Sequence, residues 1–309
     1  MSPDSLPLPP GISVLERGWL SANNIVFQGG AGGAALVDSG YCTHSAQTVA
    51  LVEAQLAGQP LVRLLNTHLH SDHCGGNAAL QQRWPQVQTL IPPGHFQQVR
   101  AWDAHELSYE PTGQECPQFR ADGVLQPGSE IELAGRAWQI HAAPGHDPHA
   151  VLLFEPDARV LISGDALWEN GFGVIFPELG GASGFAEAAD TLDIIEQLAP
   201  RIVIPGHGSV FGDVPAALAR ARQRLAVFRA QPLKHARYAA KVLLKYKLLE
   251  WQRVSEADSR AWLLATPHFR ALHAQFFAEH DIHAWHDALV HELEASGALR
   301  REGDTLVNV

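Results

Sequence analysis

Apolar residues recur along this chain with two spacings, one typical of strands and the other of helices. Short apolar runs between glycines and asparagines predict an antiparallel sheet over residues 12–37. Further strands are predicted at 61–66, 131–134, 137–142, 151–154, 159–162 and 201–204, and helices at 44–57 and 185–198. Strands and helices are therefore expected to mix along the first part of the chain.

The segment from residue 92 to residue 126 follows neither spacing, although it contains Trp102, Tyr109 and Phe119. Long irregular segments beside a binding site are often lids. A lid and a solvated surface loop with a few buried aromatic residues both fit this pattern. The sequence leaves the two interpretations open.

A helix start signal near Asp213-Val214-Pro215 marks the domain boundary that we expect. Beyond it, helices are predicted at 215–229, 234–251 and 285–297, a further helix start at 255–258, and a hairpin from 298–301 and 305–309. We therefore divide the chain into a proline-rich tail at 1–11, a domain at 12–213 and a mainly helical domain at 214–309.

Charge is spread unevenly over the 309 residues, whose formal net charge is −11. Residues 1–215 hold 8 basic and 23 acidic residues, whereas residues 216–309 hold 14 basic and 10 acidic ones. A strongly acidic protein is a poor match for nucleic acid, because phosphate contacts need a basic surface. With 46% hydrophobic residues, the chain can bury a sizeable core.

The sequence favours a cytoplasmic protein. Residues 1–11 do not combine basic residues with an apolar run as a secretory signal does, and no run is long enough for a transmembrane helix. Cys42, Cys74 and Cys116 are odd in number and lack the spacing of a metal site or a disulfide framework, which predicts reduced thiols. Cys74 is expected to be a small buried residue. A homodimer is compatible with the sequence.

Potential metal ligands are concentrated directly after the predicted strand at 61–66. His68, His70, Asp72 and His73 lie within six residues. Neutral imidazole and carboxylate groups form a normal ligand set for a divalent ion. Three later strand runs each end in a glycine followed directly by a ligand-type residue, namely His146, Asp165 and His207. Four strand ends that each deliver ligands predict a preformed site for two metals.

The ordered series His68-x-His70-x-Asp72-His73, His146, Asp165 and His207 resembles the metallo-β-lactamase-fold hydrolases, in the branch of thioesterases, lactonases and glyoxalase II. The resemblance covers residues 12–212. It implies an α/β (α+β) fold, a four-layer αββα sandwich with a C-terminal, mainly helical domain. The predicted last helix and hairpin also resemble the winged helix attached to some members of this superfamily.

The resemblance also implies a role for each ligand. The first metal would be held by His68, His70 and His146, and the second by Asp72, His73 and His207, with Asp165 bridging them. Two divalent ions lower the pKa of a shared water to about 7, which gives hydroxide at neutral pH, while one ion polarises the substrate carbonyl. Asp72 would orient this hydroxide, so Asp72 and Asp165 are the catalytic candidates. Zinc is the default ion, although iron and manganese also suit these ligands.

Departures from known relatives narrow the expected substrate. No lysine precedes Lys234, so the lysine that many class B β-lactamases place beside their zinc site has no counterpart. The basic C-terminal signature of glyoxalase II is not evident either. The leading hypothesis is a hydrolase of a small-molecule thioester or lactone. The alternatives are a nucleic-acid-processing phosphodiesterase and a metal-retaining binding protein with little turnover.

Candidate substrate residues come from two places in the chain. Position alone suggests pocket-lining roles for Tyr109, Trp168, Phe172 and Phe176. A basic stripe on the helix at 234–251 consists of Arg237, Lys241 and Lys245, at i, i+4 and i+8. Such a stripe is often only a solvated face. It would otherwise cradle the phosphates or carboxylate of a carrier such as coenzyme A or glutathione, as a C-terminal helical segment does in glyoxalase II.

Overall fold

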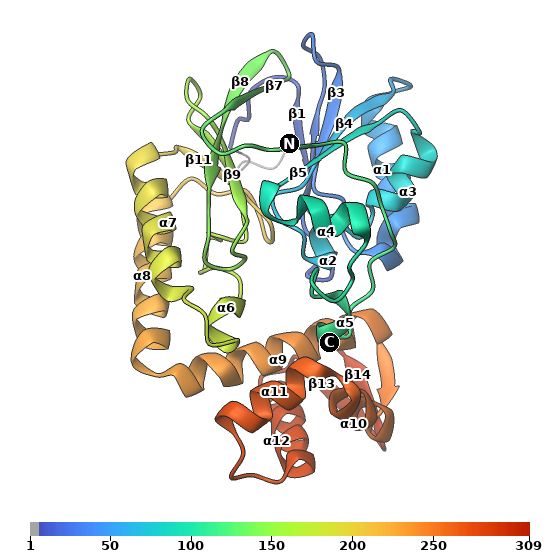
Figure 1. Cartoon of the computed structure of the whole chain (residues 1–309), viewed down its shortest axis with the longest axis vertical. Coiled ribbons are helices and arrows are strands. Elements are labelled where there is room, and N and C mark those ends of the chain that lie inside the picture. The colour runs from blue at the N-terminus through green and yellow to red at the C-terminus, as the bar shows by residue number, and fades with distance from the viewer. Residues whose placement is uncertain (1–5) are drawn as a thin grey trace. The chain divides into compact units, whose positions relative to one another are not determined.

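The computed structural model describes residues 6–309, and Figure 1 shows the order of their elements. The strands are β1 (Ile12–Leu15), β2 (Asn24–Phe27), β3 (Ala34–Val37), β4 (Leu61–Leu65), β5 (Gln88–Ile91), β6 (Gly123–Val124), β7 (Glu130–Leu133), β8 (Arg136–Ala142), β9 (Val151–Glu155), β10 (Val160–Gly164), β11 (Ile202–Pro205), β12 (Arg253–Ser255), β13 (Leu299–Glu302) and β14 (Thr305–Asn308). Every strand predicted from the sequence has a counterpart here.

Helices account for most of the remaining regular structure. The 3₁₀ helices are η1 (Cys42–His44) and η2 (Pro93–His95). The α-helices are α1 (Ser45–Leu56), α2 (Ser71–Cys74), α3 (Asn77–Arg83), α4 (Phe96–Ala101), α5 (Tyr109–Thr112), α6 (Phe176–Leu179), α7 (Phe185–Leu198), α8 (Val214–Ala230), α9 (Pro232–Trp251), α10 (Glu256–Ala265), α11 (Pro267–Phe276) and α12 (Ile282–Ala295). The segment at 92–126, for which the sequence predicted no regular structure, contains η2, α4, α5 and β6.

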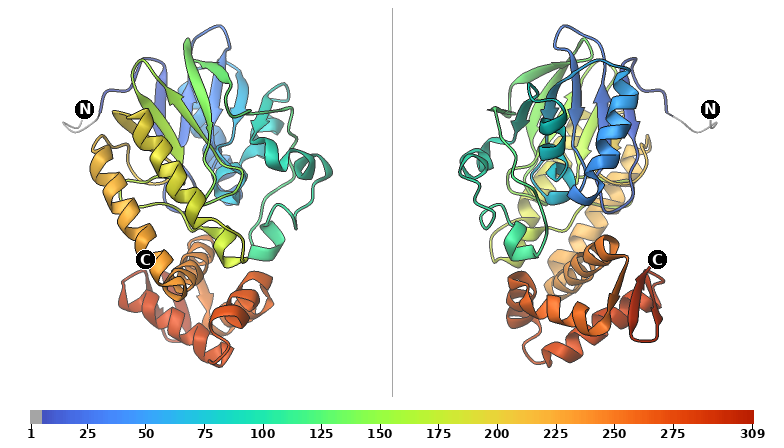
Figure 2. Two further views of the ribbon diagram at one scale, coloured as in Figure 1. Left: turned by 60° about the vertical axis from the view of Figure 1, so that its left-hand side comes forward. Right: turned by 90° about the vertical axis from the view of Figure 1, so that its right-hand side faces the viewer.

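Two β-sheets pack face to face around the main hydrophobic core (Figures 1 and 2). One has the order β1-β2-β3-β4-β5-β6, with parallel pairing from β3 onward. The other has the order β11-β10-β9-β8-β7, in which only β10 and β11 are parallel. Phe27 of the first sheet meets Trp138 of the second edge to face, with ring centroids 5.3 Å apart. Both side chains are fully buried, which holds the sheets together.

Helices cover the outer face of each sheet and complete the four layers. Val52 and Leu56 of α1 and Leu80 of α3 pack on the apolar outer side of the first sheet. On the other side, Thr191 of α7 donates a hydrogen bond to the backbone oxygen of Pro144, 2.8 Å away. The αββα sandwich implied by the family resemblance is therefore confirmed.

The strand ends that carry the predicted ligands meet at one edge of the sandwich. Two of the parallel pairs, β3 with β4 and β10 with β11, direct their carboxyl ends to this edge. Backbone hydrogen bonds then join the sheets, from Val151 N–H to Thr67 O (2.9 Å) and from Asn23 N–H to Gly206 O (2.7 Å). This edge is the place where ligands from distant parts of the chain can converge.

The chain forms two compact units. The first runs to Leu107 and continues over Glu115–Ala226, and the second consists of Ser108–Gln114 and Val227–Val309. The boundary expected before Val214 instead falls within α8, which mostly belongs to the first unit. Ion pairs from Arg222 of α8 to Asp193 and Glu196 of α7 link α8 to the first unit.

The second unit combines α5 and α9 to α12 with a small sheet of order β12-β14-β13. Ser255 caps α10 by accepting a hydrogen bond from Asp258 N–H (3.0 Å), and Asp281 caps α12 in the same way. The predicted helix and hairpin correspond to α12, β13 and β14. The sequence did not predict β12 or α11, which complete this unit.

Candidate metal centre

The ligands predicted for the first metal lie together in the structure. The metal-binding atoms of His68, His70 and His146, which we call the first cluster, all lie within 4.8 Å of one another. His70 Nδ1 is 2.8 Å from His146 Nε2. His68 is buried, and its Nε2 atom has no hydrogen-bond partner among residues 6–309. A buried nitrogen left without a partner is costly, and a bound metal would satisfy it.

The ligands predicted for the second metal form a separate group. Asp72, His73, Asp165 and His207, which we call the second cluster, also place their ligand atoms within 4.8 Å of one another. Asp72 Oδ2 lies 3.0 Å from His207 Nε2, and Asp165 Oδ1 lies 3.3 Å from His73 Nε2. All four side chains are buried or nearly so. Two nitrogens and two carboxylates match the preferences of a borderline divalent ion.

Asp165 lies between the two clusters. Its Oδ2 atom is 3.5 Å from His146 Nε2, while its Oδ1 atom faces His73 in the second cluster. The residue directly follows β10, and Gly206 after β11 leaves room for it: a Cβ atom at Gly206 would lie 2.2 Å from Asp165 Oδ1. A carboxylate placed in this way can be shared by two metals.

The loop after β4 presents four of the ligands because it folds into the single turn α2. His70 caps this turn, and its backbone oxygen accepts hydrogen bonds from the N–H groups of His73 (2.9 Å) and Cys74 (3.1 Å). The backbone oxygen of His73 in turn accepts from Ser39 N–H (2.7 Å) and from the Asn66 side chain (3.1 Å). These bonds fix the direction in which the ligands leave the loop.

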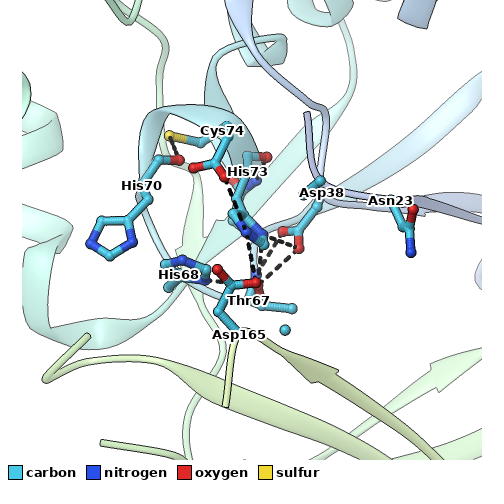
Figure 3. Close-up of polar contacts among 12 residues, drawn as sticks. Asn23, Asp38, Thr67, His68, His70, His73, Cys74 and Asp165 are labelled. Atoms are coloured by element: carbon cyan, nitrogen blue, oxygen red, sulfur yellow. Dashed lines mark hydrogen bonds and ion pairs between the residues drawn. The ribbon is translucent and has the colours of Figure 1, made fainter. Parts of the chain in front are cut away.

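The buried carboxylate of Asp38 contacts His73 on Nδ1, the ring nitrogen opposite the one that faces Asp165 (Figure 3). Asp38 Oδ2 lies 2.8 Å from His73 Nδ1 and accepts a hydrogen bond from Thr67 Oγ1 at 2.8 Å. Asp38 Oδ1 accepts from Thr67 N–H at 2.9 Å. A carboxylate on the far nitrogen fixes the tautomer of a ligating imidazole and leaves Nε2 free to bind metal. Sequence reasoning missed Asp38, although it directly follows β3 and precedes the turn at Gly40.

Two histidines of the first cluster also have partners on their other nitrogen. His146 Nδ1 donates to the backbone oxygen of Val174, 2.5 Å away. His70 Nε2 lies 3.8 Å from a carboxylate oxygen of Asp147, the residue that follows His146. Each ring is therefore oriented from outside the cluster, as ligating histidines usually are.

The two clusters differ in their proton affinity. Burial lowers the pKa of His68 well below its ordinary value, and neighbouring histidines lower it further. Burial and the nearby His146 lower the pKa of His70 to about 4. Both rings are thus neutral at pH 7 and ready to bind a metal.

In the second cluster, nearby carboxylates determine the protonation state of His73. Burial by itself would lower the pKa of His73, but Asp38, Asp165 and Asp72 outweigh it and hold the pKa well above its ordinary value. Burial would raise the pKa values of Asp72 and Asp165, yet the positive charge of His73 leaves both below their ordinary values. The second cluster therefore holds a proton on His73 that a metal has to displace.

Aromatic side chains flank the clusters on two sides. Trp19 stacks on His207 with ring centroids 5.4 Å apart and is 58% exposed. Trp168 contacts both rings edge to face, and its Nε1–H donates to Asp165 Oδ1 at 3.1 Å. Phe176 lies against His70, with centroids 5.2 Å apart. Trp168 and Phe176 were expected near the site. Trp19 was not, and its position in the glycine-containing turn between β1 and β2 was the available signal.

The other predicted substrate residues are in different environments. Phe172 is buried and lines a cavity together with His146 and Asp165. Tyr109 is also buried, but it belongs to α5 in the second unit. The basic stripe is on α9 of the same unit, where Arg237 and Lys241 form ion pairs with Glu292. Lys245 donates to the backbone oxygens of Ala298 and Val309 and to Asn308. All three members of the basic stripe thus have partners inside the second unit.

Within residues 6–309, no helix combines the length and the apolar character needed to cross a bilayer.

Comparisons with known proteins point to one family. The chain is 26% identical to the acyl-coenzyme A thioesterase MBLAC2 of Homo sapiens over 165 residues, which are 50% of this chain and 59% of that protein. It is 32% identical to a hydroxyacylglutathione hydrolase of Anaeromyxobacter dehalogenans over 161 residues, or 52% of each chain. The chain thus spans between half and three-fifths of the length of these curated relatives.

A solved structure extends the similarity in fold. A metallo-beta-lactamase family protein from Thermus thermophilus superimposes with a TM-score of 0.58 and 22% identity, covering 97% of this chain and 99% of that one. The sequence model described as the metallo-beta-lactamase superfamily matches residues 17–207, a range that includes both clusters and every ligand in them. This chain therefore belongs to the metallo-beta-lactamase superfamily.

Proposed function

We propose that the chain is a hydrolase that uses two divalent metal ions to cleave a small-molecule thioester, with a lactone as the next candidate substrate. The first metal is assigned to the first cluster, and the second to Asp72, His73 and His207, with Asp165 shared between them. The observation that carries this proposal is the position of Asp165, whose two oxygens face one cluster each.

The donor set supports this assignment. The site combines buried imidazole nitrogens with two carboxylates, those of Asp72 and Asp165, that remain charged at neutral pH. One of these nitrogens, His68 Nε2, has no hydrogen-bond partner among the described residues. This combination suits zinc best, and it also suits iron and manganese. A dinuclear pair of such ions supplies an activated water at neutral pH and polarises a substrate carbonyl.

The protein's own side chains define how the reaction proceeds around that centre. Asp72 is 14% exposed, so its charged carboxylate can accept a hydrogen bond from an incoming water and fix the direction of attack. The nearby serine hydroxyls are already engaged: Ser39 donates to Asn77 Oδ1 (2.7 Å) and Ser163 to Leu167 O (2.6 Å). Water rather than a side chain is therefore the nucleophile in this proposal.

Two observations favour a thioester. The names of the relatives describe hydrolysis of acyl-coenzyme A and of hydroxyacylglutathione, both of which are thioesters. In addition, Trp19 and Phe176 provide apolar surface on two sides of the clusters, which suits the acyl part of such a substrate. The basic stripe supports a phosphodiesterase less well, because its cations already pair with groups of the second unit.

The test is hydrolysis of a panel by protein whose metal content has been measured. The panel contains an acyl-coenzyme A, a hydroxyacylglutathione, an acyl homoserine lactone and a single-stranded oligonucleotide. We expect thiol release that is lost in Asp165→Asn and retained in Asp190→Asn, a matched change on an exposed part of α7. Protein that holds two metals but releases no thiol from either thioester would overturn the proposal. Cleavage of the lactone or of the oligonucleotide would then identify the alternative.

A further inference from the structure

The three cysteines, which are far apart in the sequence, lie close together in the first unit. Cys74 Sγ is 3.8 Å from Cys116 Sγ. Cys42 Sγ lies 3.5 Å from the backbone oxygen of Glu115, the residue before Cys116. Sequence spacing gave no indication of such a pair, because the three positions come from η1, α2 and an irregular segment.

A metal does not account for this arrangement. Over residues 6–309, the groups of ligand atoms close enough to hold one ion are the two clusters of histidine and aspartate. The three sulfurs are not among these groups, and all three cysteines are reduced thiols in the structure. Thiol chemistry is therefore the function to consider.

We propose that Cys74 and Cys116 form a redox site, at which a hydroperoxide oxidises the two thiols to a disulfide. A disulfide bond is about 2.05 Å long, so the two sulfurs have to approach by roughly 1.8 Å. Cys116 lies in an irregular segment, where the backbone can make this adjustment. Cys74 is held in place at the end of α2, with its sulfur 3.4 Å from Leu69 O and 3.3 Å from His70 O.

The difference in exposure assigns a role to each thiol. Cys116 is partly exposed and Cys74 is fully buried. The Cys116 thiolate attacks the terminal oxygen of the hydroperoxide, the O–O bond breaks, and an alcohol or water leaves with one proton. The resulting sulfenic acid is then attacked by the Cys74 sulfur. An S–S bond forms, the S–O bond breaks, and water leaves with the Cys74 proton. Two thiols are oxidised and one hydroperoxide is reduced.

The two thiols lie beside the second cluster. Cys74 directly follows His73, and α2 carries both Asp72 and His73 of the second cluster. A disulfide would tie this turn to the segment that contains Cys116. The inference rests on the thiol geometry alone, so it stands or falls independently of the proposed substrate.

The test uses the metal-loaded, full-length protein and hydrogen peroxide as the probe. After a brief exposure, thiols are counted under denaturing conditions and disulfide-linked peptides are mapped by mass spectrometry. We expect the three thiols to fall to one, a Cys74–Cys116 peptide pair to appear, and the three thiols to return after treatment with dithiothreitol. Three unchanged thiols, oxidation only to sulfinic or sulfonic acid, or a link to Cys42 would each overturn the proposal.

Single substitutions separate the pair from the third cysteine. Cys42→Ser is the matched control, and it should still form the Cys74–Cys116 disulfide at the same rate. Cys116→Ser should keep its two remaining thiols under the same exposure. Loss of two thiols in Cys116→Ser would show that Cys42 and Cys74 react with each other, which the proposal does not allow. The peptide map of the unaltered protein decides the matter if a variant does not fold.

Discussion

Asp38 offers the sharpest test of how the second cluster is built, through the substitution Asp38→Asn. The residue has φ of 58°, a left-handed conformation that asparagine adopts as readily as aspartate, so the change introduces no backbone strain. It replaces one carboxylate oxygen with an amide N–H₂ group. If Oδ1 keeps its hydrogen bond from Thr67 N–H, the amide nitrogen faces His73 Nδ1.

The expected effect follows from the tautomer of His73. An amide donor opposite Nδ1 favours the tautomer that carries its proton on Nε2, the atom that faces Asp165 and is needed for metal. Loss of a carboxylate partner of this kind typically lowers metal affinity by about 10- to 100-fold, or roughly 1.4 to 2.7 kcal/mol. A hydrogen bond to a charged group contributes about 1.5 to 3 kcal/mol, a range that agrees with the expected loss of metal affinity. We therefore expect a loss of about 30-fold in affinity for the second metal.

The assay is competition for zinc with a chromophoric chelator, which resolves two binding steps. Asp38→Asn should weaken one step by about 30-fold and leave the other nearly unchanged. Asp190→Asn, an exposed substitution of the same chemistry, is the control and should change neither step. If both affinities in Asp38→Asn stay within about twofold of the unaltered protein, which is under about 0.5 kcal/mol, Asp38 does not hold His73 in the tautomer that binds metal.

Three further outcomes are expected. Because the pKa of metal-free His73 is raised and those of His68 and His70 are lowered, loading both sites at pH 7 should displace about one proton from His73, and the metal-activated water should release a further fraction of a proton. Affinity should rise with pH up to the raised pKa of His73, and titration calorimetry in buffers of different ionisation enthalpy would contradict this prediction by showing no proton release. Asp147→Asn should weaken the first site by only a few fold, since its oxygen is 3.8 Å from His70, as chelator competition would show. Trp19→Ala should raise KM for an acyl thioester by about three- to tenfold at unchanged metal content, and an unchanged KM would exclude Trp19 from substrate binding.

The grouping of the candidate metal ligands could be predicted from the sequence because these residues are encoded locally. Each follows an apolar strand, and parallel strands bring their carboxyl ends to one edge, so the spacing of His68, His146 and His207 along the chain was sufficient. The same reasoning did not find Asp38 or Trp19, although one directly follows a strand and the other lies in a glycine-containing turn. These positions alone do not predict their contacts with His73 and His207, which depend on which strands pair and on how the turn between β1 and β2 folds.

The basic stripe shows a different limit of sequence reasoning. Spacing correctly placed Arg237, Lys241 and Lys245 on one helix, α9. Their partners, however, are Glu292 and the backbone near the end of the chain, which come together only through the packing of α12 and the hairpin. A pattern within one helix predicts which side chains share a face, but it does not predict what that face meets.

The route of the chain between its two units limits how the protein can be shortened. The second unit includes Ser108–Gln114, a short insertion within the first unit, and its helix α5 packs on α11. At Gly113 an added Cβ atom would be only 2.9 Å from Trp262 Nε1, so this packing is tight. A chain ending at Ala226 would keep α5 but lose α11, the helix on which α5 packs. Isolating the sandwich as a fragment therefore requires a second cut, with Leu107 joined to Glu115 by a short linker.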